Sequence, residues 1–234
     1  MTHPGSVVPQ PGPASLRSRP ASAGRAAIVA TLLLALGGCS LLGGGEREAT
    51  TIYAPDPRVT LDASAPSVSW QLMLNTPQAS RMIDSSRILV QPTPGELQVY
   101  RGASWAKPPP AMLEDTLLRA LEDSGRIPAV ARQGTGILAD YKLVLELRRF
   151  EADYAGHAVP AAAIEFNAKL IHTRDQSIVA SRTFGHGEPA AGTDIALVAD
   201  AFSRGLQRLT GELALWILTE GDAHQRQAHP ADAP

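Results

Sequence analysis

Cysteine is nearly absent from this sequence, since Cys39 is the only one among 234 residues. No disulfide can form within the chain, so its folded part must be held together by an apolar core. The sequence also lacks an apolar run of the roughly 20 residues that a membrane-spanning helix needs. The run at residues 26–36 stops at glycines after eleven residues. It is therefore too short to span a bilayer.

Acidic residues are missing upstream of this apolar run, whereas Arg17, Arg19 and Arg25 precede it. A basic segment followed by a short apolar segment is typical of a secretory signal. The run ends in Leu36, two glycines and Cys39, and this order resembles a bacterial lipobox. The resemblance implies that Cys39 is acylated and becomes the first residue of the mature protein. The alternative is a free thiol buried in the core. A cysteine flanked by glycines at the end of the apolar run has no apolar core to enter, which speaks against this alternative.

Lipobox sorting rules give a localisation. Aspartate after the cysteine favours the inner membrane, and here the residue is Ser40. The rule therefore implies a lipid anchor in the outer membrane, facing the periplasm. Removing residues 1–38 leaves 18 basic and 23 acidic residues, a net charge of −5. Nucleic-acid binding requires clustered basic residues, so the charge speaks against a nucleic-acid partner.

Composition divides the chain into four parts. Residues 1–38 form the signal peptide, and residues 39–69 form a lipidated N-terminus and a flexible tether rich in glycine and proline. Residues 70–220 form one folded domain of ordinary size. Residues 221–234 are polar and contain two prolines, which predicts a disordered tail.

Apolar periodicity predicts the elements of the domain. Alternating residues and short apolar runs predict strands at residues 70–75, 87–92, 96–102, 127–133, 141–148, 163–172 and 177–184. The last three of these strands are predicted to form a meander. Spacing of three and four predicts a helix from Ala111 to Gly125 and a long amphipathic helix from Ile195 to Ile217. The long helix packs on the sheet or, alternatively, offers a groove to a protein partner.

This order of elements favours an α+β fold. We expect a two-layer sandwich with a mixed or mostly antiparallel sheet and both helices on one face. The other face carries Lys142, Glu146, Glu165 and Lys169, so it meets water or a partner.

Few residues suggest catalysis or metal binding. His157, His172 and His186 have no metal-ligand spacing, and neither a zinc-protease motif nor a nucleophile elbow occurs. We therefore expect no metal and no cofactor. His186 and Glu188 can form an acid–base pair on one side of a strand, which would make the protein a hydrolase. The glycines around His186 instead favour a flexible exit loop.

Four segments together carry a family resemblance: residues 81–91, 99–125, 139–156 and 177–184. They resemble the ABC-type transport auxiliary lipoproteins, which accompany MCE-domain lipid transport systems and include the lipoprotein of the paraquat-inducible system. The matching positions are Asp84, Ser85, Arg87, Ile88, Tyr100, Trp105, Pro108, Asp140, Tyr141 and Phe150.

The resemblance implies an outer-membrane lipoprotein without catalysis. It would dock or receive the periplasmic conduit of a lipid transport system, with an MCE protein and an ABC permease and ATPase as partners. The family also admits a homo-oligomeric ring. Tyr100 and Trp105 are candidate partner-binding residues, because aromatic side chains are frequent interface anchors. Trp105 has a second interpretation, as an apolar plug at the helix start. The alternative function is an assembly or stability factor for an outer-membrane protein.

Overall fold

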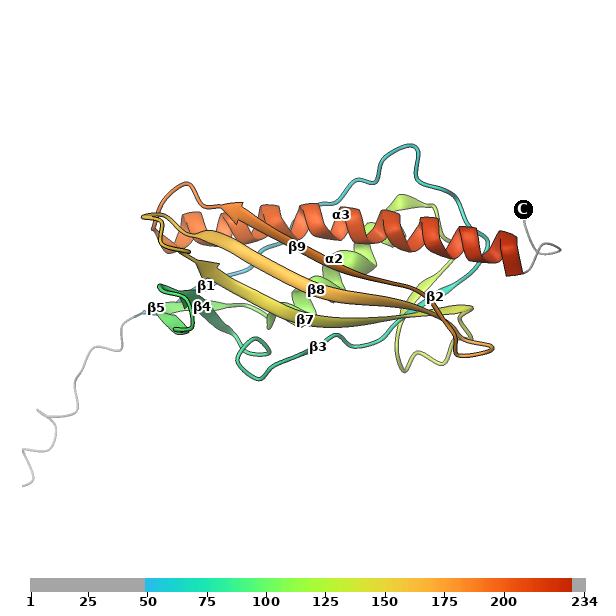
Figure 1. Cartoon of the computed structure of the whole chain (residues 1–234), viewed down its shortest axis with the longest axis horizontal. Coiled ribbons are helices and arrows are strands. Elements are labelled where there is room, and N and C mark those ends of the chain that lie inside the picture. The colour runs from blue at the N-terminus through green and yellow to red at the C-terminus, as the bar shows by residue number, and fades with distance from the viewer. Residues whose placement is uncertain (1–48, 229–234) are drawn as a thin grey trace, which may run out of the picture. The chain divides into compact units, whose positions relative to one another are not determined.

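The structure, a computed structural model, describes residues 49–228. Its strands form one mixed sheet of nine strands, and two helices accompany it (Figure 1). The elements follow the chain as β1 Thr51–Tyr53, β2 Leu72–Leu74, β3 Gln78–Ala79, β4 Arg87–Gln91, β5 Gln98–Trp105, α2 Pro109–Ser124, β6 Val130–Arg132, β7 Tyr141–Asp153, β8 Ala161–His172, β9 Ile178–Pro189 and α3 Ile195–Ala228. The predicted α+β sandwich is confirmed.

Strands β7, β8 and β9 form the predicted antiparallel meander. Before the middle of β7, odd-numbered residues such as Leu145 and Leu147 are buried, as the alternation predicts. The register with β8 then shifts between Leu147 and Arg149, and afterwards Phe150 and Ala152 are buried. A β-bulge of this kind exchanges the two faces of a strand. The shift therefore turns Arg149 to the face away from the helices.

The other side of β7 pairs in parallel with three short strands, β2, β3 and β4. Strand β4 continues into the predicted antiparallel hairpin with β5, and β1 then pairs in parallel with β5. The sheet is therefore mixed, and β9 and β1 form two of its edges.

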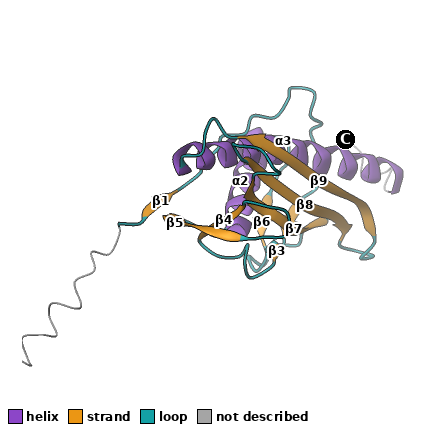
Figure 2. Ribbon diagram, turned by 60° about the vertical axis from the view of Figure 1, so that its left-hand side comes forward, coloured by secondary structure: helices purple, strands orange, loops and turns teal. Residues whose placement is uncertain are grey.

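Both helices lie on one face of the sheet and contact each other (Figures 1 and 2). Helix α2 begins with two prolines, which fit a first helical turn, and ends at Gly125 with φ 62°. Its Leu113, Leu117 and Leu121 are fully buried. The equivalent stripe of α3 includes Phe202 and joins the same core. The helices thus cover the apolar face, as predicted.

The structure moves the beginning of the folded domain to before residue 70. Within the predicted tether, Ile52 pairs with Ser104, and the Ala106 N–H donates to the Tyr53 carbonyl at 2.8 Å. Ala65 is buried in the core. The prediction of a tether up to residue 69 is therefore wrong. The parallel partner of β1 lies some fifty residues further along the chain, so no local sequence pattern predicts this pairing.

The end of the domain also differs from the prediction. Helix α3 continues to Ala228 instead of ending before a tail at residue 221. Gly221 lies against the Trp70 ring, and the Tyr141 hydroxyl is 2.8 Å from His224 Nδ1. Tertiary contacts thus order a polar segment that composition alone assigns to a tail.

The predicted signal peptide, Cys39 and residues 229–234 lie outside the described part of the chain. Neither described helix has an apolar stretch of the length that crosses a membrane.

Candidate functional site

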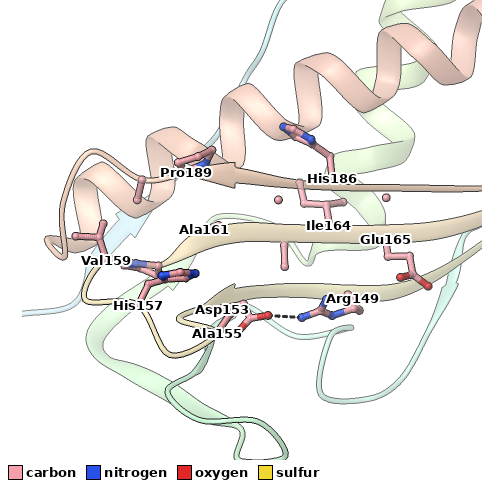
Figure 3. Close-up of a pocket in the computed structure, with 15 residues that line it drawn as sticks. Arg149, Asp153, Ala155, His157, Val159, Ala161, Ile164, Glu165, His186 and Pro189 are labelled. Atoms are coloured by element: carbon pink, nitrogen blue, oxygen red, sulfur yellow. Dashed lines mark hydrogen bonds and ion pairs between the residues drawn. The ribbon is translucent and has the colours of Figure 1, made fainter.

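A hollow of the described residues forms a trough on the face of the sheet that the helices leave uncovered (Figure 3). It has a volume of about 620 Å³ and lies over the end of β7, the β7–β8 loop, β8 and β9. Alanine, glycine and proline pair across most of its floor, where Ala161 faces Pro189 and Ala163 faces Gly187, and Glu165 faces Gly185 at the next pair. The floor is thus a plain sheet surface with few side chains above it.

The two glycines of the floor are not required by the fold. Neither has a positive φ, and an added methyl group would lie 3.6 Å from Glu165 Cγ at Gly185 and 3.8 Å from Ala161 Cβ at Gly187, both ordinary contacts. Glycine within a strand costs about 0.5–1 kcal/mol relative to alanine. What the glycines provide at these positions is an open trough, because a larger side chain would fill it.

Acidic groups dominate the rim of the trough. Arg149 is held between two carboxylates, with its Nε 2.6 Å from Glu151 Oε1 and its Nη2 2.8 Å from Asp153 Oδ2. Glu165 adds a further carboxylate, and Figure 3 shows it on the same side as Arg149. The only arginine of the rim is therefore neutralised. Such a rim is unsuited to binding a phosphate or another anion.

The two histidines that line the trough point in different directions. His157 lies on its rim beside Val159, whereas His186 points across the sheet toward α3 (Figure 3). Among the residues from 49 to 228, no three histidine, cysteine, aspartate or glutamate side chains are arranged to hold a metal ion. The trough offers shape and a negative rim, but no activated nucleophile.

His186 and Glu188, the predicted acid–base pair, do come together, with 3.0 Å between His186 Nε2 and Glu188 Oε2. They lie within β9, so the predicted exit loop is wrong. Arg204 of α3 donates from Nε to the other Glu188 oxygen at 2.9 Å and from Nη2 to the Pro189 carbonyl at 2.9 Å. Arg204 also pairs with Asp200. The carboxylate therefore fastens the end of β9 to α3.

The hydrogen bond from Arg204, followed by that from His186, lowers the pKa of Glu188 below its ordinary value of 4.5. A lowered pKa means that the ionised carboxylate stabilises the fold above about pH 4.5 and that this contribution fades as the pH falls further. We expect Glu188→Gln to lower the melting temperature at pH 7 and to have less effect at pH 3. Thermal unfolding at both pH values checks this. An equal drop in melting temperature at pH 7 and pH 3 would contradict the interpretation that the charged carboxylate of Glu188 holds β9 to α3.

The two candidate partner-binding residues lie largely inside the domain. Trp105 is only 2% exposed and packs edge-on against Phe150 and Phe202. Its assignment as a surface anchor is therefore wrong, and the plug interpretation fits. Tyr100 is half-buried, with its hydroxyl buried. Burial, followed by the neighbouring Tyr154, raises the pKa of Tyr100.

Sequence reasoning missed the trough. The alternation of Gly185 and Gly187 along β9 was a signal, since two strand glycines on one face leave that face open. The position of Arg149 was not predictable, because the bulge that reorients it depends on pairing with β8.

A sequence model of the ABC-type transport auxiliary lipoprotein component family matches residues 51–214. The match begins at β1 and extends well into α3, so it covers most of the described domain. The chain belongs to this family. Its members are auxiliary components of ABC-type transport systems, and the early start of the match agrees with the corrected beginning of the folded domain.

Two similar structures support the family fold. The crystal structure of protein XCC0632 from Xanthomonas campestris is 55% identical and matches with a TM-score of 0.74 over 76% of this chain and 99% of that chain. An uncharacterised protein of 15% identity matches with a TM-score of 0.54 over 69% of this chain and 99% of that chain, which shows a shared fold alone.

A curated relative, the uncharacterised protein bll6063 of Bradyrhizobium diazoefficiens, is 25% identical over 178 residues. The match covers 76% of this chain and 47% of that protein. This auxiliary lipoprotein thus spans about half the length of the curated relative.

Proposed function

We propose that this auxiliary lipoprotein is a non-catalytic outer-membrane component of an MCE-type lipid transport system. It would dock or receive the conduit that carries lipid across the periplasm. The observation that carries the proposal is the family match over residues 51–214, which links the domain to an ABC-type transport system. The trough adds a hollow on the uncovered face of the sheet in which a segment of a partner could lie.

Acylation of Cys39 would supply the membrane anchor. Each buried CH₂ group contributes about 0.8 kcal/mol to membrane affinity, so several acyl chains hold a protein stably. Thr51 follows Cys39 by twelve residues. At no more than about 3.6 Å per residue, β1 would lie within about 43 Å of the anchor. The domain would therefore stay near its membrane, closer than a tether ending at residue 69 would allow.

The trough is the surface that we assign to a protein partner. Its floor carries small residues apart from Glu165, and the carboxylates of its rim are Asp153 and Glu165, while the rim residue Arg149 is paired with Glu151 and Asp153. A partner segment with a basic residue and an apolar side chain fits this chemistry. This assignment replaces the candidate Trp105, whose ring is not accessible.

Co-purification from detergent-solubilised membranes tests the function. We expect the wild-type protein to retain an MCE protein with its permease and ATPase, and Cys39→Ser to appear in the soluble periplasmic fraction. Recovery with an outer-membrane barrel alone would support the assembly-factor alternative. Full transport activity in a strain with only soluble Cys39→Ser would contradict the need for the anchor.

Ser40→Asp provides a matched control for localisation. It leaves Cys39 available for acylation but introduces the residue that favours the inner membrane. We expect this variant to move from the outer-membrane to the inner-membrane fraction of a density gradient. An unchanged distribution would contradict the proposed sorting, while leaving acylation itself intact.

A further inference from the structure

A second surface, next to the trough on the same face of the sheet, combines exposed apolar side chains at the β4–β5 hairpin. Met82, Leu97 and Val99 are 43%, 43% and 39% exposed. Met82 and Leu97 line one hollow above the buried Leu89, which is also lined by Arg148 and by the carboxylates of Glu96 and Glu151. Val99 pairs with Leu89 across the hairpin. These side chains form one exposed patch rather than scattered positions. Single exposed apolar residues need no explanation, but a patch marks an interaction site.

Three arginines accompany this patch: Arg81 beside Met82, Arg87 at the start of β4, and Arg101 two residues after Val99. All three are exposed, and among residues 49–228 none of them has an ion pair or a side-chain hydrogen bond. Arg149 and Arg204, by contrast, are each held by two carboxylates. We call the three arginines and the three apolar residues the hairpin surface.

The hairpin surface lies on the strands next to the point where the chain enters the domain. Strand β1 pairs with β5, which carries Val99 and Arg101, and Figure 2 shows β1, β4 and β5 together at one end. The twelve residues from Cys39 to Thr51 limit the distance of this end from an acylated Cys39, as calculated above. Of the described elements, β1 and its neighbours would thus lie closest along the chain to an acylated Cys39.

We propose that the hairpin surface contacts the bilayer that holds the lipid anchor. Met82, Leu97 and Val99 would enter the headgroup region, and the three arginines would bind anionic lipid phosphates. Apolar side chains with basic neighbours are the combination that binds such interfaces. The contact would orient the domain with its β4–β5 end on the membrane. The proposal rests on the anchor of the proposed function, but not on the identity of the transport partners.

Vesicle flotation tests the surface without the acyl chains. The mature chain from residue 39 with Cys39→Ser is mixed with vesicles of phosphatidylcholine, alone or with added phosphatidylglycerol. We expect binding only to the anionic vesicles, and weaker binding at higher salt. Each arginine near an anionic surface contributes about fivefold to the partition coefficient. Arg87→Ser with Arg101→Ser should therefore weaken binding about 25-fold, and Leu97→Ser should weaken it further.

The matched control is Lys169→Ser with Arg174→Ser, which removes the same charge from exposed positions on β8 and the turn after it. We expect this control to bind like the parent. No binding to anionic vesicles, or an equal loss in the control, would overturn the proposal. A dimer in light scattering that only the hairpin variants abolish would instead assign the surface to a second copy.

The outcomes separate this inference from the proposed function. Co-purification of the MCE system without vesicle binding would remove the membrane contact alone. Vesicle binding that depends on Arg87 and Arg101, without recovery of transport partners, would support the contact and remove the transport role.

Discussion

Trp105→Ala should lower the free energy of unfolding by about 3–5 kcal/mol, as expected for a buried aromatic residue. The indole ring is 2% exposed, and its centroid lies 5.9 Å from that of Phe150 and 5.2 Å from that of Phe202. It joins β5 to β7 and to α3, so its loss leaves a cavity where three elements meet. Urea unfolding followed by far-ultraviolet circular dichroism measures the change.

Trp105→Phe is the control for this prediction. It keeps an aromatic ring and removes the buried indole N–H, which has no hydrogen-bond partner among the described residues. We therefore expect a smaller loss than for alanine. If Trp105→Ala kept the stability of the parent and abolished co-purification with a transport partner, the surface-anchor interpretation would return.

Gly221→Ala should destabilise the domain by about 1–3 kcal/mol, the usual cost of overpacking. Alanine normally stabilises a helix relative to glycine by about 1 kcal/mol. At this position, however, the added methyl group would lie 2.9 Å from Cε2 and Cη2 of Trp70 and overlap Cζ2. The clash with a rigid ring should outweigh the helix preference. The same urea titration reports the result.

Gly211→Ala is the matched change two to three turns earlier in α3. Its methyl group would lie 3.5 Å from Val59 Cγ1, an ordinary contact. We expect it to stabilise the domain by about 0.8–1 kcal/mol. Stabilisation by both substitutions would mean that Trp70 does not pack on Gly221, and would favour the disordered tail predicted from residue 221.

The elements with a local signal could be predicted from the sequence. Alternation in β7 and β8, the spacing of leucines in α2 and the long apolar stripe of α3 each lie within one continuous segment. Because the direction of the side chains along a strand or helix repeats with a fixed period, the apolar pattern of such a segment predicts whether it is a strand or a helix and which face is buried. The absence of large side chains at Gly185 and Gly187 was likewise visible, although its meaning was not.

Features that join segments far apart in the chain could not be predicted and were found in the folded domain. The parallel pairing of β1 with β5 moved the beginning of the domain, and the bulge in β7 turned Arg149 toward the trough. Burial of Trp105 follows from packing against α3, nearly a hundred residues later. Arg87 and Arg101 come onto neighbouring strands only because β4 and β5 pair, and Arg81 lies in the turn that precedes β4. Register and packing between distant segments have no local period, and so the sequence does not display them.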